Sequence, residues 1–146
     1  MTAPPSGDTT CAFCAIVQGR ASARVVWRSE EIIAFLPDVP AVAGHTLVVP
    51  NQHVRDIWDV DLRLGRKLAD ATLRVASGVA SAVGTRQMNI IQSSGAAAGQ
   101  SVFHLHVHIV PREAEDRMPR MWPSDAVWQP EDLDQIAAVL GAALAG

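Results

Sequence analysis

The stretch that decides the fold is residues 101–111, which read SVFHLHVHIVP. Its three histidines, His104, His106 and His108, stand at alternate positions with apolar residues between them. Successive side chains of a β-strand point to opposite faces, so a strand would place all three imidazoles on one face. A helix, with 3.6 residues per turn, would spread them over about 200° of its circumference. The pattern therefore predicts a strand. Its core-facing side would carry Phe103, Leu105, Val107 and Ile109.

A loop of small residues, SGAAAGQS at 94–101, precedes this strand. Glycine-rich backbone can bring N–H groups close to an anion. A single strand histidine is usually a packed or solvated residue, but imidazole near neutral pH can also serve as nucleophile, acid, base or metal ligand. Three aligned imidazoles that follow a loop rich in backbone N–H donors favour a protein that acts on phosphate groups.

Residues 99–112, GQSVFHLHVHIVPR, resemble the signature of the histidine triad (HIT) superfamily, in particular its zinc-containing bacterial-type members. The resemblance extends from about Cys11 to Arg112 and is weaker in the C-terminal third. It implies a nucleotidyl hydrolase or transferase that forms a covalent nucleotidyl-histidine. It also implies an α+β HIT-like fold with a five-stranded antiparallel sheet, and a homodimer.

Composition bounds the remaining possibilities. The chain has 146 residues, of which 49% are apolar and 18% charged, as expected of one globular domain. Its net charge is −3 and Lys67 is its one lysine, which argues against a nucleic-acid partner. We expect no membrane partner, because no apolar run approaches the roughly 20 residues of a membrane span. With no signal-peptide pattern at the N-terminus, the sequence favours a cytoplasmic protein.

Hydrophobic periodicity predicts the other elements. We expect a flexible tail at residues 1–9 and a single HIT domain over 10–146. Further strands are expected at 24–28, 31–36, 45–49 and 88–92. A long helix is expected over about 59–83 because its apolar residues recur at steps of three or four. Short helices are expected near 14–17 and over 130–143, the last with Ile136, Val139 and Leu140 facing inward.

The Cys11-x-x-Cys14 pair allows three interpretations. It could be a redox pair, although the surrounding hairpin pattern is not the βαβ context typical of one. It could be half of a zinc site, which needs two more nitrogen or sulfur ligands. It could also be two buried free thiols. The resemblance implies the zinc site, with His53 and His104 completing one structural zinc per chain.

The resemblance also implies the roles of the other histidines. His106 would be the nucleophile, with its Nδ1–H held by a backbone carbonyl, expected to be that of His104. His108 would contact the phosphate oxygens. His45 would support the triad through hydrogen bonds, although a simple strand-end histidine is the plainer interpretation. We predict the catalytic set His104, His106, His108 and Ser101.

The nucleotide and phosphate contacts are predicted less directly. The turn of Gly99 and Gln100, with the Ser101 hydroxyl, would lie near the leaving atom. The acidic residue that binds ribose in relatives matches Pro37 here, and Asp38 comes one residue late. Ser93 replaces a longer amide side chain of many relatives. The predicted nucleotide-binding set is Asp38, Ser93, Gly99, Gln100 and His45.

Several alternatives stay open in the sequence. Phe13, Ile16 and Phe35 could line a base pocket or belong to the core. Trp122 and Trp128 could shape the leaving-group side, or serve packing or a dimer contact. The substrate could be a dinucleoside polyphosphate or a nucleoside phosphoramidate. Two other functions compete with this one. The chain could be a nucleotide-binding interaction protein with little or no catalysis, or its three histidines could hold a catalytic metal.

Overall fold

The computed structural model describes residues 10–146, so the tail expected at 1–9 lies outside the described residues. Five antiparallel strands form one sheet in the order β1-β2-β3-β5-β4. The strands are β1 (Arg24–Arg28), β2 (Ile32–Leu36), β3 (Thr46–Pro50), β4 (Met88–Gln92) and β5 (Val107–Pro111). The helices are α1 (Ala12–Val17), α2 (Leu62–Val83) and α3 (Pro130–Leu144), with a 3-10 turn η1 (Ala96–Ala98). The predicted α+β fold with one long helix is confirmed.

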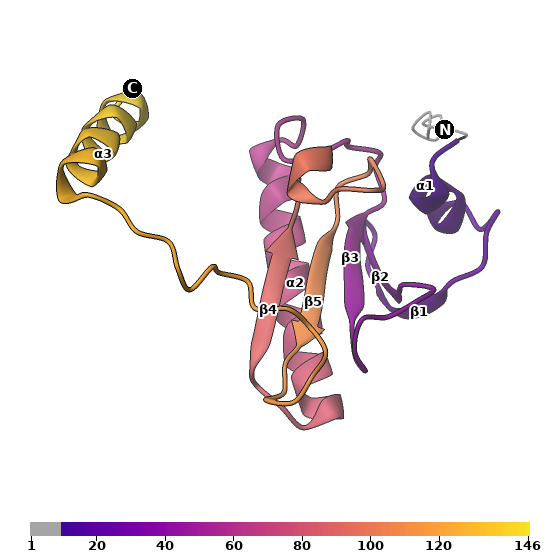
Figure 1. Ribbon diagram of the computed structural model, residues 1–146. Coiled ribbons are helices and arrows are strands. Elements are labelled where there is room, and N and C mark those ends of the chain that lie inside the picture. Colours follow the sequence, from indigo (N-terminus) through magenta and orange to yellow (C-terminus); the bar gives the residue numbers. More distant parts are fainter. Residues whose placement is uncertain (1–9) are drawn as a thin grey trace.

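The two faces of the sheet have different covers. Helix α2 runs along one face (Figure 1), where it packs on a cluster that includes Ile32, Val48 and Ile109. Helix α1 lies over the other face beside β1 and β2, and Phe13 joins a second cluster there with Ile33 and Val49. Because α1 has only six residues, it covers a small part of its face. No helix among the described residues is both long and apolar enough to span a membrane.

Helix α2 begins at Leu62, three residues later than expected. The Asp61 side chain accepts a hydrogen bond from the backbone N–H of Leu64 at 2.7 Å, which caps the first turn and sets the start. The helix ends at Val83 and is capped by Gly84, which has φ 79° in the left-handed region. Most of the predicted apolar stripe is buried: Leu64, Leu68, Ala71 and Val75.

Strand β5 is shorter than the sequence suggested. It begins at Val107, so His104 and His106 lie in irregular backbone before it. The N–H of Leu105 donates to the carbonyl of Val54 at 2.7 Å, which ties this segment to the chain after β3 rather than to a neighbouring strand. Phe103 was expected in the core, but it is 37% exposed and lies under the guanidinium of Arg55. The other three predicted core residues, Leu105, Val107 and Ile109, are buried.

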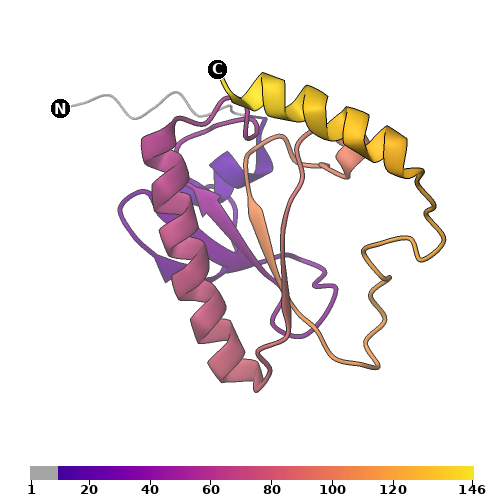
Figure 2. The ribbon, with the colours of Figure 1, turned by 90° about the vertical axis from the view of Figure 1, so that its left-hand side faces the viewer.

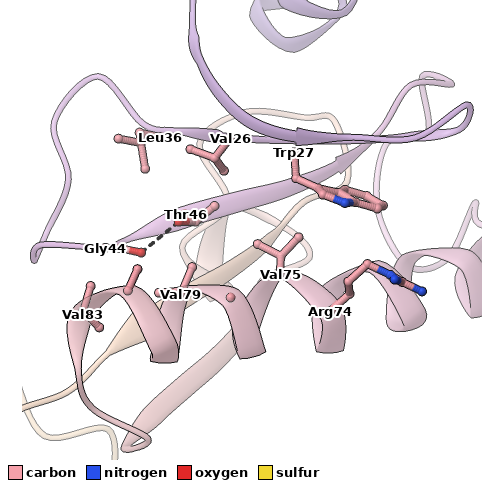
Figure 3. Close-up of a pocket in the computed structure, with 11 residues that line it drawn as sticks. Val26, Trp27, Leu36, Gly44, Thr46, Arg74, Val75, Val79 and Val83 are labelled. Atoms are coloured by element: carbon pink, nitrogen blue, oxygen red, sulfur yellow. Dashed lines mark hydrogen bonds between the residues drawn. The ribbon is translucent and has the colours of Figure 1, made fainter.

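Gly44 determines how the chain enters β3. Its φ is 89°, and a Cβ at this position would lie 2.8 Å from Cγ1 of Val83. Its carbonyl accepts from the Thr46 hydroxyl at 2.9 Å, beside an apolar cavity of about 410 Å³ between α2 and the β1–β2 hairpin (Figure 3). Only glycine permits both this backbone angle and this approach to α2. His45 follows directly and is delivered to the opposite face of the sheet.

Helix α3 forms where predicted but is not packed as predicted. Ile136, Val139 and Leu140 were expected to face inward, and all three are exposed. After Arg112 the chain passes beyond the β4 edge, and α3 stands apart from the sheet (Figure 1); Figure 2 views the molecule from the side on which α3 lies. The predicted helix and its apolar stripe are present, but no element described in this chain covers the apolar face.

Candidate active site and metal centre

His106 is held in one tautomer by the backbone. Its Nδ1–H donates to the carbonyl of His104 at 2.7 Å, the hydrogen bond that the motif predicted. The imidazole is 6% exposed, and its ring meets the ring of Phe13 edge to face at 5.1 Å. With the proton on Nδ1, Nε2 keeps its lone pair. The arrangement therefore presents a neutral imidazole with one free nucleophilic nitrogen.

A chain of hydrogen bonds fixes the tautomer of His108. The backbone N–H of Ala41 donates to Nδ1 of His45 at 3.0 Å, so the proton of neutral His45 is on Nε2. That Nε2 lies 2.9 Å from Nδ1 of His108 and donates to it. The proton of His108 is then on Nε2. The centroids of the His106 and His108 rings lie 4.9 Å apart, so the ring that carries this N–H neighbours the ring of the nucleophile.

The pKa values of His45, His106 and His108 are all lowered, which favours the neutral form of each imidazole. Burial lowers the pKa of His108 to about 4, with a further contribution from His106 and His45. Burial also lowers the pKa values of His45 and His106. Near pH 7 these rings are uncharged, which is the condition under which the tautomers follow from the hydrogen bonds.

Four side chains gather between α1 and the start of the histidine segment. Nδ1 of His104 lies 3.4 Å from Sγ of Cys11 and 3.5 Å from Sγ of Cys14. Nδ1 of His53 lies 3.2 Å from Sγ of Cys14, and the four ligand atoms are all within 4.8 Å of one another. The four residues predicted as metal ligands are thus brought together.

The cluster fits zinc. Bond lengths of about 2.3 Å to sulfur and 2.0–2.1 Å to nitrogen, at a tetrahedral angle, place sulfur and nitrogen about 3.6 Å apart. Nε2 of His104 donates to the carbonyl of Pro50 at 2.8 Å, which leaves the Nδ1 lone pair facing the sulfurs. Both nitrogens of His104 are therefore engaged by the protein, and neither is directed at a substrate.

The loop before the histidines is more closed than expected. The N–H groups of Gly95, Ala98, Gly99 and Gln100 all donate to acceptors within the loop. The buried side chain of Gln100 accepts from Gly95 N–H at 2.8 Å and donates to the carbonyls of Arg55 and Val102. Gln100 therefore shapes the loop from inside, which corrects the picture of a flexible turn with its donors open to an anion.

The remaining predicted residues are more loosely placed. Ser101 is exposed and lines a cavity of about 370 Å³ with Cys11 and Phe103. Ser93 follows β4 and is half-buried, and Asp38 is exposed in the loop after β2.

The candidates for a base pocket turn out to be packed side chains. Phe35 is 2% exposed and meets Phe13 edge to face at 5.4 Å, so both belong to the core. Ile16 packs at the margin of the same cluster. Phe13 also touches the rings of His104 and His106, so it is the wall against which these two imidazoles rest.

Sequence reasoning missed a network at the end of β5. The Arg112 guanidinium donates to both carboxylate oxygens of Asp116, at 2.7 and 3.0 Å, and to Oδ1 of Asn89 at 2.7 Å. The Arg112 guanidinium holds the pKa of Asp116 well below its usual range. Opposite charges four residues apart, directly after the motif, were the available signal. The network fixes the direction in which the chain leaves the sheet.

Comparison with known proteins defines the family. The HIT domain model matches residues 18–115, and the chain belongs to this family. The protein called Protein hit of Bacillus subtilis is 32% identical over 137 residues, which cover 92% of this chain and 94% of that protein. Adenosine 5'-monophosphoramidase HNT1 of Saccharomyces cerevisiae is 29% identical over 137 residues, covering 93% of this chain and 82% of that protein.

Solved structures agree with the fold. SMU.412c from Streptococcus mutans superposes with a TM-score of 0.87 at 31% identity, over 97% of this chain and 91% of that one. A zinc-bound histidine triad family protein from Mycobacterium smegmatis superposes with a TM-score of 0.73 at 34% identity, over 82% of this chain and 86% of that one. A zinc-bound neighbour accords with the Cys/His cluster of this chain.

Proposed function

We propose that this protein hydrolyses nucleotidyl–X bonds at the α-phosphorus through a covalent nucleotidyl-His106 intermediate. The observation that carries the proposal is the hydrogen bond from His106 Nδ1–H to the His104 carbonyl. It leaves Nε2 as a fixed nucleophile beside His108, whose ring is 4.9 Å away.

The first step forms a phosphorus–nitrogen bond. The Nε2 lone pair of His106 attacks the α-phosphorus, and the P–X bond breaks with its electron pair leaving on X. The phosphorylated ring becomes an imidazolium, and its Nδ1–H stays on the His104 carbonyl. This hydrogen bond strengthens as positive charge develops on the ring, so it favours the transition state over the ground state.

His108 stabilises charge on the phosphoryl group. Its Nε2–H, fixed by His45, is the donor that would meet a nonbridging oxygen. Ser101 would donate a hydrogen bond near the leaving atom, which takes a proton from solvent water as it departs. In the second step water attacks the phosphorus, the P–N bond breaks, and the nucleoside monophosphate leaves with His106 restored and a proton released.

Zinc, when bound, would supply a structural cross-link rather than a Lewis acid. Cys11, Cys14, His53 and His104 would hold it, and the cross-link would pin α1 to the histidine segment. Because His104 also carries the carbonyl that fixes His106, a stable position for His104 keeps the nucleophile aligned. We propose that His104 acts by position and does not touch substrate.

We propose that the residues predicted from the motif bind the nucleotide. Asp38 and Ser93 would approach the ribose and phosphate, and Gly99 and Gln100 would hold the loop that carries Ser101. The adenosine monophosphoramidase named among the relatives makes nucleoside phosphoramidates the first substrate class to test. A homodimer, as the resemblance implies, is part of the proposal.

The test is turnover on a panel of adenylyl and guanylyl phosphoramidates and dinucleoside polyphosphates, followed as nucleoside monophosphate release. We expect hydrolysis of at least one class, unchanged at early times after addition of chelator. Binding of these nucleotides without any turnover would contradict the proposal and favour a nucleotide-binding interaction protein. Immediate loss of turnover on chelation would instead favour a catalytic metal.

A further inference from the structure

The apolar cavity of about 410 Å³ between α2 and the β1–β2 hairpin lies on the face of the sheet opposite to His106 and His108 (Figure 3). Small-molecule sites in proteins are hollows of about 300–1,000 Å³ with mostly apolar walls and a few polar groups. The walls here fit this description, because valines of α2 face Leu36 and Thr46 across the cavity. The Thr46 hydroxyl is already paired with the Gly44 carbonyl at 2.9 Å. The interior therefore suits a hydrocarbon group.

A β-bulge in β1 turns two successive side chains toward this cavity. Val25 pairs with Phe35 and Trp27 pairs with Ala34, so Val26 is the extra residue. In a regular strand Val26 and Trp27 would lie on opposite faces, but both line the cavity. Val26 stays 53% exposed, so the bulge contributes more to the cavity wall than to the core.

Gly78 widens the cavity from the side of α2. It lines the cavity, and a Cβ at this position would meet no atom of the described residues within 4 Å beyond its chain neighbours and its own helix backbone. Glycine is the least favourable residue in a helix interior after proline. The packing of the described residues therefore does not require glycine here. A molecule lying in the cavity would explain why a side chain is missing at this position.

Arg74 supplies a charge at the mouth of the cavity. Figure 3 shows Trp27 and Arg74 together at one end of the cavity, with Val83 toward the other. The Arg74 side chain is 63% exposed and lies 3.9 Å from a carboxylate oxygen of Asp70. This distance is too long for a hydrogen bond, so the guanidinium N–H groups stay available to an anion.

The head group that fits this position is a carboxylate. The planar guanidinium of arginine matches the two oxygens of a carboxylate. The nearby Asp70 carboxylate disfavours a head group with two negative charges, such as a phosphate monoester, because like charges repel. A single negative charge at the end of a hydrocarbon chain is therefore the complement of this cavity.

The volume sets the size of the ligand. A cavity of about 150 Å³ holds one benzene, so 410 Å³ has room for roughly 12–16 non-hydrogen atoms. We propose that the cavity between α2 and the β1–β2 hairpin binds a medium-chain carboxylate, whose hydrocarbon chain lies among the valines and whose carboxylate meets Arg74. The site lies across the sheet from the proposed nucleophile and does not depend on the proposed hydrolysis.

The experiment titrates the full chain with decanoate and with two probes of the same chain length, neutral 1-decanol and cationic decyltrimethylammonium. Calorimetry gives the dissociation constant, and amide shifts in NMR spectra locate the site. Gly78→Leu and Ala82→Leu each fill the cavity, while Ser77→Leu places the same side chain at an exposed position of α2 outside the lining. Arg74→Gln removes the charge, with Arg66→Gln on the same helix as its control.

We expect one decanoate per chain, with a dissociation constant of about 0.1 mM or tighter and amide shifts centred on Val26, Trp27 and Val79. Each cavity-filling variant should weaken decanoate binding at least about tenfold without lowering the melting temperature, because the added side chain enters open space. Arg74→Gln should weaken decanoate at least about fivefold and leave 1-decanol unchanged. Decyltrimethylammonium should bind more weakly than decanoate, and both control variants should match the wild type.

The site is overturned if the wild type does not bind decanoate, or if binding survives both cavity-filling variants. Amide shifts centred on Phe13 and Ile16, on the catalytic face, would also overturn it. An Arg74→Gln variant that binds decanoate as tightly as the wild type, or that loses decanoate and 1-decanol equally, would overturn the carboxylate as the ligand class. The hydrolase proposal is followed separately by nucleotide turnover, which none of these outcomes decides.

Discussion

The two histidines that flank His106 are held in opposite ways. On one side, both ring nitrogens of His104 are committed, Nε2 to the Pro50 carbonyl and Nδ1 to the cysteine cluster. On the other side, Nδ1 of His108 is committed to His45, and no hydrogen bond holds its Nε2 among residues 10–146. The same residue type at equivalent motif positions is therefore structural in one case and chemically available in the other. The partners of the ring nitrogens, not the motif, decide which.

The largest expected effect is at His106, which lies between these two histidines in the motif. His106→Asn removes the nucleophile, and we expect turnover to fall at least about 10³-fold, since a residue that forms the covalent intermediate has no substitute. Melting temperature and zinc content should match those of the wild type. Turnover within tenfold of wild type would show that some other group attacks.

Disrupting the cysteine–histidine cluster that holds His104 should lower the free energy of unfolding. Cys14→Ser removes a ligand from the cluster, and we expect metal loss with a destabilisation of about 3 kcal/mol or more, a fall of roughly 6–12 °C in melting temperature. Ala12→Ser, on the same helix, is the control. The two would be measured by elemental analysis and thermal unfolding. A metal-free wild type, with Cys14→Ser as stable as the control, would instead support two buried free thiols.

Substitutions of His108 and of its partner His45 should lower kcat. We expect His108→Asn to lower kcat about 10²–10³-fold by removing a donor to the phosphoryl oxygens. His45→Asn should lower kcat up to about tenfold with little change in KM, because it releases the tautomer of His108 without removing the ring. In the double variant the His45 change should have no further effect. Additive losses would show that His45 acts independently of His108.

The smallest effect is on the pH dependence of stability. Burial lowers the folded-state pKa of His108 to about 4 from an ordinary value of 6.5. Between these values the unfolded chain binds a proton that the folded chain does not, so stability falls as pH drops from about 6.5 toward 4. His108→Asn keeps the metal cluster, so its stability should fall less steeply over this window in urea titrations. Parallel curves would contradict the assignment of a neutral, buried His108.

The parts of this site that sequence could predict are those set by spacing along the chain. Alternation predicted that the three histidines act together, and the Cys11-x-x-Cys14 spacing predicted half of a metal site. The resemblance implied the contact of His106 with the His104 carbonyl. The resemblance implied that His45 supports the triad through hydrogen bonds, and the structure identifies His108 as its partner. The parts that sequence could not predict depend on backbone groups from distant segments. Val54 shortens β5, Pro50 orients His104 and Ala41 orients His45, and a backbone carbonyl or N–H leaves no mark on residue identity.

The exposure of α3 could not be predicted for a different reason. Its apolar stripe was visible at Ile136, Val139 and Leu140, and inward packing was the natural interpretation for one domain. What covers a helix depends on where the preceding segment leads. That direction is set by the Arg112–Asp116–Asn89 network, which joins a residue of β4 to two residues of the segment that follows β5.

The central claim is tested most directly by trapping the intermediate. Wild-type protein would be mixed with a nucleoside phosphoramidate or a dinucleoside polyphosphate, quenched within milliseconds under conditions that preserve phosphohistidine, and analysed by peptide mass spectrometry. The account predicts a nucleoside monophosphate adduct on His106 in the wild type and none in His106→Asn. Steady turnover without any adduct, or an adduct on His104 or His108, would contradict it.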